Sequence, residues 1–105
     1  MHVLIIDDEA AVRQILASAV TRAGYSADTA ENAREGAAKL VRGDVDVALC
    51  DIRMPDGDGV ELVRSFRGSG IDTQFIMVTA FASVETAVDA LRLAQAQHAD
   101  IDLRR

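Results

Sequence analysis

The chain has 105 residues, of which 50% are hydrophobic and 27% charged, and its formal net charge is -6. This length fits one small globular domain and excludes two. The acidic balance argues against a surface that neutralises nucleic-acid phosphates, and the chain has neither a signal-type N-terminus nor an apolar run near the ~20 residues of a membrane span. Because Cys50 is the only cysteine, an internal disulfide and a cysteine metal site are excluded, and we expect a cytoplasmic protein.

Short apolar runs alternate along the chain with longer stretches of helical periodicity, a pattern typical of a parallel α/β sheet. Residues 3–6 are predicted as a buried strand, because four consecutive apolar residues suit a strand covered on both faces. A helix follows over residues 10–23, and Gly24 is a natural helix stop. Residues 25–30 are predicted as a second strand.

The second half of the chain repeats this alternation. Asn32 can cap a helix over residues 33–41, and residues 45–50 are predicted as the third strand. A loop rich in Gly then leads into a short helix with Val60, Val63 and Phe66 on its apolar face. The fourth strand is predicted at residues 75–78, and Ser83 can cap a fourth helix with Val84, Ala87, Val88 and Leu91 on one face.

The last residues carry a weaker pattern, because the apolar stripe of the fourth helix fades after Leu91. A continued helix and a frayed tail both stay open for this stretch. We therefore expect one domain over residues 1–93, followed by a divergent helical extension or tail over residues 94–105.

Acidic residues gather at one end of the predicted sheet. Asp7 and Asp8 follow the first strand, and Asp51 ends the third. In a doubly wound, flavodoxin-like parallel sheet of order 2-1-3-4, these strands are neighbours and a crevice opens at their carboxyl ends. Clustered carboxylates repel one another unless a cation joins them, and hard oxygen ligands favour Mg²⁺ or Mn²⁺. The pattern predicts a divalent metal site; acids that merely cap helices are the alternative.

Three segments of the chain together resemble the receiver (CheY-like) domains of two-component response regulators. They are VLIIDDE at residues 3–9, DIRMPDGDG at residues 51–59 and IMVTA at residues 76–80. They occur in the order and at the spacing typical of the family, and the resemblance covers the chain from residue 2 to the end of the predicted domain. The segment SVETAV after the fourth strand looks most like receivers attached to transcriptional regulators.

The resemblance implies a role for each matching acid. Asp51 would accept a phosphoryl group from the phosphohistidine of a sensor histidine kinase or a phosphotransfer protein. Asp8 would ligate Mg²⁺ directly and Asp7 mainly through water, with Asp51 and the main-chain carbonyl of Arg53 as further ligands. Such a domain would take part in its own phosphorylation and dephosphorylation without being a turnover enzyme.

The resemblance also assigns the end of the fourth strand. Thr79 would hydrogen-bond a phosphoryl oxygen, and Ala80 would keep the approach to it open. Phosphorylation would then change the surface that partners bind. A phosphatase of the haloacid-dehalogenase type is disfavoured, because it would need an acid where this chain has Arg53.

The chain departs from the family after the fourth helix. Receivers normally continue with a fifth strand that ends in Lys-Pro and with a fifth helix, whereas the only lysine here is Lys39, and Ile101 falls where the family lysine would stand. That lysine would supply a charge-assisted bond of roughly 1.5–3 kcal/mol to the phosphoryl group. A degenerate receiver that acts as a dimerisation or interaction module without phospho-switching is therefore the alternative function.

The missing elements also predict an assembly. Without a fifth strand and helix, the fourth strand would be an open edge, and apolar surface beside the first helix would be exposed. We therefore expect a homodimer in which the fourth helix or the tail of one subunit covers the other.

Overall fold

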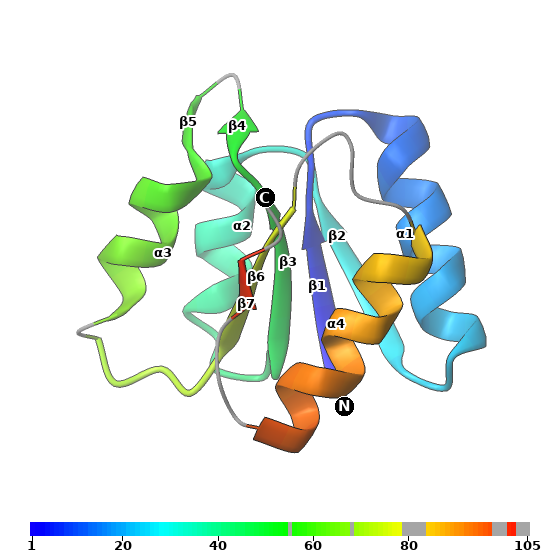
Figure 1. Ribbon diagram of the computed structural model, residues 1–105. Helices are drawn as coiled ribbons and strands as arrows, with labels where there is room; N and C mark the ends of the chain where they lie inside the picture. The colour runs from blue at the N-terminus through cyan, green and yellow to red at the C-terminus, as the bar shows by residue number, and fades with distance from the viewer. Residues whose placement is uncertain (55, 68, 79–83, 98–100, 103–105) are drawn as a thin grey trace.

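The structure, a computed structural model, describes residues 1–54, 56–67, 69–78, 84–97 and 101–102. One parallel sheet has the order β2-β1-β3-β6-β7, and helices cover both of its faces (Figure 1). Its strands are β1 (His2–Ile6), β2 (Ser26–Ala30), β3 (Val47–Asp51), β6 (Gln74–Val78) and β7 (Ile101–Asp102). The helices are α1 (Ala10–Arg22), α2 (Ala33–Leu40), α3 (Gly59–Arg67) and α4 (Val84–Gln97). A small antiparallel hairpin joins β4 (Arg53–Met54) to β5 (Gly57–Asp58).

The predicted order of the first four parallel strands is confirmed. β1 lies between β2 and β3, and β6 follows β3. The register aligns the ends of the two central strands, because Ile6 lies opposite Cys50. The next residue of each strand therefore emerges at the same edge of the sheet, which is how Asp7 and Asp51 become neighbours.

Both faces of the sheet are apolar, which explains the uninterrupted hydrophobic runs in the sequence. On one face Leu4 and Ile6 pack with residues of α2 and α3, including Leu40 and Phe66. On the other face alternate strand residues pack with α1 and α4. The buried residues of this second cluster are Val3, Ile5, Leu16, Val20, Val47, Leu49, Ile76, Ala87, Ala90, Leu91 and Ala94.

The position of α4 corrects the prediction that the surface beside the first helix would be exposed. α4 lies beside α1 on the same face of the sheet (Figure 1), with Ala90 and Ala94 buried in the shared cluster. The small side chains of α4 allow close packing, and burial of the apolar strand residues on this face stabilises the arrangement. The β6–α4–β7 connection consequently has the opposite hand to the other three, which are right-handed as parallel crossovers normally are.

The end of the chain differs in part from the expectation. α4 continues to Gln97, and β7 pairs in parallel with β6 through Ile76 and Met77, so the predicted open edge is wrong for these two residues. β7 is only two residues long and lies at the fifth position of the sheet, beside β6, and the described residues end with this strand. None of the helices described here has the length and hydrophobicity that a membrane span requires.

Candidate functional site

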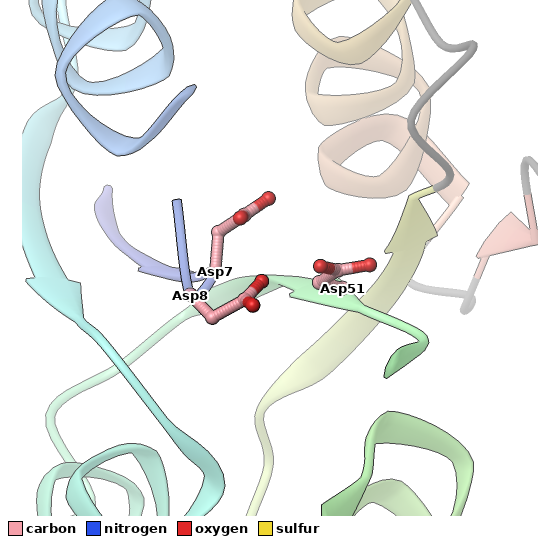
Figure 2. A group of neighbouring side chains, drawn as sticks. All are labelled: Asp7, Asp8 and Asp51. Carbon is pink, nitrogen blue, oxygen red and sulfur yellow. The ribbon is translucent and has the colours of Figure 1, made fainter. Parts of the chain in front are cut away.

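Three carboxylates from two strands meet at the carboxyl edge of the sheet. Asp7 and Asp8 directly follow β1, and Asp51 is the last residue of β3. One carboxylate oxygen from each lies within 4.8 Å of the other two (Figure 2). The convergence that the strand order predicted is therefore present, with Asp7 and Asp51 partly buried and Asp8 exposed.

The main chain around Asp7 is held on both sides. Its amide donates to the carbonyl of Ala30 in β2 at 3.0 Å, and its own carbonyl accepts a hydrogen bond from Arg13 Nη1 at 2.7 Å. The Asp7 side chain accepts from the amide of Glu9 at 2.9 Å, the local turn that Asp favours before a helix. Sequence reasoning missed Arg13; its place one helical turn after Glu9 is the only signal that it could reach back to the cluster.

The electrostatics of the cluster favour a bound cation. Partial burial raises the pKa of Asp7, and the neighbouring charges of Asp8 and Glu9 raise it further, while the Glu9 amide and Arg13 oppose this shift without cancelling it. Two unit charges at about 5 Å repel by roughly 1 kcal/mol in water and by roughly 3 kcal/mol at an effective dielectric constant of 20. At Asp7, therefore, the Glu9 amide and Arg13 do not offset the effect of burial and of the adjacent acids.

The segment after Asp51 is packed tightly against the strand. The amide of Gly59, the first residue of α3, donates to the carbonyl of Ile52 at 2.7 Å. A Cβ atom at Gly59 would overlap the main-chain carbonyl oxygen of Asp51 and lie 3.1 Å from Cys50 Sγ. Only glycine lets the helix start this close to the strand end. Sequence reasoning placed Gly59 in the loop and missed this contact, which a glycine at the first helical position could have indicated.

The other predicted site residues are placed only in part. Arg53 lies in β4, two residues beyond Asp51, so its main-chain carbonyl belongs to the segment that leaves the cluster. Thr79 and Ala80 lie outside the described residues. The chain's single lysine is bound elsewhere, because Lys39 Nζ donates to Asp28 Oδ1 at 2.9 Å and to the carbonyl of Thr29 at 2.6 Å.

The donor set fits a hard divalent cation. It consists of carboxylate oxygens alone, of which those on Asp8 are open to water, and Mg²⁺ typically binds one or two carboxylates and keeps several waters. A soft metal would favour thiolate or imidazole ligands, and neither belongs to this group. Asp7, Asp8 and Asp51 are therefore the described residues that could hold such an ion.

Comparison with known proteins relates the chain to response regulators. The sequence profile of the response regulator receiver domain matches residues 3–99. The chain is 41% identical over 91 residues to the regulatory protein AtoC of Escherichia coli, which covers 87% of this chain but only 20% of AtoC. The chain thus spans about a fifth of that relative's length.

Solved structures agree in fold. The response regulator TrrA of Thermotoga maritima, in complex with Mg²⁺ and BeF, aligns with a TM-score of 0.77 and 29% identity over 99% of this chain and 85% of TrrA. TrrA in complex with the histidine kinase ThkA aligns with a TM-score of 0.75 and 29% identity over 97% of this chain and 83% of the other. The profile match over most of the chain, the sheet order and the acidic edge agree, and the chain belongs to the response regulator receiver domain family.

Proposed function

We propose that Asp51 is the phosphoacceptor of this receiver domain, and that Asp7, Asp8, Asp51 and the main-chain carbonyl of Arg53 bind the Mg²⁺ or Mn²⁺ ion that the reaction needs. The observation that carries the proposal is the meeting of three carboxylates at the carboxyl edge of β1 and β3. The complex of TrrA with Mg²⁺ and BeF supports it by similarity.

Each acid of the cluster has its own role in the proposed phosphoryl transfer. A carboxylate oxygen of Asp51 bonds to phosphorus while the N–P bond of a kinase phosphohistidine breaks and the histidine takes up a proton. Asp7 and Asp8 hold negative charge beside Asp51, so that the cluster binds a divalent ion. When bound, that ion balances the charge of the transferring oxygens, which is most of what phosphoryl transfer requires of a protein. In this scheme the domain takes part in its own phosphorylation and dephosphorylation and is not a turnover enzyme.

The partner in this proposal is a sensor histidine kinase or a phosphotransfer protein, and the domain works in the cytoplasm. The structure of TrrA with the kinase ThkA supports the partner class by similarity. Thr79, which follows β6 in the sequence, is proposed to hydrogen-bond a phosphoryl oxygen, and Ala80 to keep the approach to it open. Lys39, the single lysine of the chain, is bound to Asp28 and to the Thr29 carbonyl of β2, so the proposal assigns it no contact with the phosphoryl group.

The homodimer stays a prediction, and the structure leaves less exposed surface to support it than the sequence suggested. α4 of the same chain covers the surface beside α1, and β7 pairs with two residues of β6, so the first surface that motivated a dimer is covered and the second is paired only in part. The exposed apolar side chains that remain on these helices include Ile15 and Leu93. Light scattering at increasing protein concentration tests the prediction, and a monomer at all concentrations would contradict it.

Phosphorylation is tested by incubating the protein with acetyl phosphate and Mg²⁺ and measuring its intact mass. We expect an increase by one phosphoryl group that disappears when a metal chelator is added beforehand. Asp51→Asn should show no increase, whereas Asp44→Asn, which alters an exposed acid in the loop before β3, should behave as the unaltered protein does. A wild-type protein that stays unmodified while an authentic receiver reacts in parallel would favour the degenerate receiver instead.

A further inference from the structure

The hairpin after the phosphoacceptor strand is tied to a distant helix by one carboxylate. Asp56 lies in the turn between β4 and β5, and its Oδ1 accepts from the amide of Ala33 at 2.9 Å while its Oδ2 accepts from the amide of Arg34 at 3.0 Å. Both amides belong to the first turn of α2, more than 20 residues earlier in the chain. Hydrogen bonds from these amides hold the pKa of Asp56 below its ordinary value, so the carboxylate is charged at neutral pH.

This contact is additional to the helix's own cap. Asn32 Oδ1 accepts from the amide of Glu35 at 2.8 Å, as an N-cap residue does. Asn32 leaves the two preceding amides of the first turn without an acceptor within the helix, since such amides point out of its end. Asp56 supplies that acceptor for both, and in doing so fastens the hairpin tip to α2.

The hairpin is then fixed at three levels between its base and its tip. At the base, the amide of Gly59 donates to the carbonyl of Ile52 at 2.7 Å. In the middle, Arg53 pairs with Asp58, and the side chain of Met54 is buried in the cluster under α2 and α3. The tip is held by the Asp56 carboxylate. The segment that carries the Arg53 carbonyl is therefore held at the base, the middle and the tip of the hairpin.

We infer that Asp56 is a positioning residue for the metal site: by anchoring the hairpin to α2, it sets the Arg53 main-chain carbonyl in place for the ion held by Asp7, Asp8 and Asp51. The inference rests on the proposed function, because that function supplies the role of the carbonyl. Asp56 does not touch the ion in this scheme; it acts through the backbone of β4. Groups that orient a metal ligand affect affinity without being ligands themselves.

The first test measures the Mg²⁺ dissociation constant by following backbone amide resonances near the acidic edge during titration. Asp56→Ala loses both bonds to α2, and we expect its dissociation constant to rise about tenfold. Asp56→Asn keeps one acceptor oxygen, so its Mg²⁺ dissociation constant should lie between those of the wild type and of Asp56→Ala. Asp44→Asn, which removes an exposed charge at the other end of β3, should match the wild type.

The readout separates positioning from simple stabilisation. A residue that only caps α2 would change the unfolding midpoint and leave the Mg²⁺ dissociation constant of the folded protein unchanged. That outcome would overturn the inference while the proposed function stands. If the wild-type protein itself bound no Mg²⁺, both would be overturned.

A second test needs no variant. Coupling between two sites is reciprocal, so Mg²⁺ binding must strengthen the bonds to Asp56 by the same factor by which those bonds strengthen Mg²⁺ binding. Amide hydrogen exchange at Ala33 and Arg34 should therefore slow by about tenfold at saturating Mg²⁺. The amide of Asp46, bound to the carbonyl of His2 at the opposite end of the strands, is the internal control. Equal slowing at all three amides, or none, would contradict the inference.

Discussion

Replacing Asp7 with asparagine should stabilise the metal-free protein and weaken its response to Mg²⁺. The change removes one negative charge from a cluster whose oxygens lie within 4.8 Å of one another. Asparagine keeps a side-chain oxygen that can accept from the Glu9 amide, so the turn before α1 is preserved. The expected change is therefore mainly electrostatic.

The distances between the carboxylates set the expected increase in the free energy of unfolding of Asp7→Asn. Two unit charges 4.8 Å apart interact by about 0.9 kcal/mol in water and about 3.5 kcal/mol at an effective dielectric constant of 20. Asp8 is exposed and contributes near the lower value, whereas Asp51 is partly buried. Arg13 partly offsets the charge of Asp7. We expect the free energy of unfolding to rise by about 1–3 kcal/mol at neutral pH without metal.

The stability advantage of Asp7→Asn over the wild type should depend on pH in a defined direction. Burial and the neighbouring acids raise the pKa of Asp7 above 3.8 in the folded state. The folded protein therefore holds the Asp7 proton more tightly than the unfolded chain, and the wild type loses stability as pH rises from 3.8 through the folded pKa. The advantage of Asp7→Asn should vanish below that window and reach its full size above it.

Urea unfolding at neutral pH, with and without Mg²⁺, measures both effects. A ligand at ten times its dissociation constant stabilises the folded state by about 1.4 kcal/mol. Mg²⁺ at that level should stabilise the wild type by this amount and Asp7→Asn by clearly less, which narrows the difference between them. Asp44→Asn should show neither effect. Destabilisation of metal-free Asp7→Asn, or an undiminished response of this variant to Mg²⁺, would refute the reasoning.

Three further substitutions test the packing around the site, each measured by urea unfolding. Gly59→Ala should lower the free energy of unfolding by about 1–3 kcal/mol, because its Cβ would overlap the carbonyl at the end of β3. Gly57→Ala should change it little, because a Cβ there makes only an ordinary 3.5 Å contact. Ala94→Glu should lower the free energy of unfolding by more than about 2 kcal/mol, because it buries a charge beneath α4. Ala96→Glu, at an exposed position of the same helix, should not. Equal unfolding midpoints for this pair would contradict the packing of α4 on the sheet. Lys39→Met should lose about 1 kcal/mol with its bonds to β2, and an unchanged midpoint would show that these bonds add nothing.

The pH dependence of the Lys39 contact has the opposite sign to that of Asp7. Partial burial alone would raise the pKa of Asp28, but hydrogen bonds from Lys39 and from the Thr29 amide outweigh it and hold the pKa below 3.8. The stability that this carboxylate contributes is present above its ordinary pKa and is lost as pH falls through the folded value. The wild type and Lys39→Met should therefore converge in strong acid, and a constant difference down to that range would contradict the assignment.

The periodic elements of the fold were predictable from the sequence, because each carries a local signal. The helix predicted over residues 10–23 is α1 at Ala10–Arg22, and the apolar run at residues 3–6 is β1 within one residue. The hairpin of β4 and β5 was missed, since strands of two residues have no periodicity. The face that α4 covers was also missed, because it depends on which apolar surface is left uncovered, and the usual hand of parallel crossovers favours the opposite face.

The candidate site could be predicted only as far as its acids. Strand order and strand ends bring Asp7, Asp8 and Asp51 together, and both can be inferred from sequence patterns. The contacts of Arg13 and Asp56 could not, because each joins a side chain to backbone groups whose position depends on the tertiary fold. A motif places residues at the site, whereas the groups that hold the motif in place come from elsewhere in the chain.

A crystal structure of the protein grown with Mg²⁺ tests the central claim most directly. We expect density for one ion bound by oxygens of Asp8 and Asp51, with Asp7 held to it directly or through water and the Arg53 main-chain carbonyl among the ligands. Carboxylates of Asp7, Asp8 and Asp51 that point away from one another, with no ion between them at a saturating Mg²⁺ concentration, would contradict it.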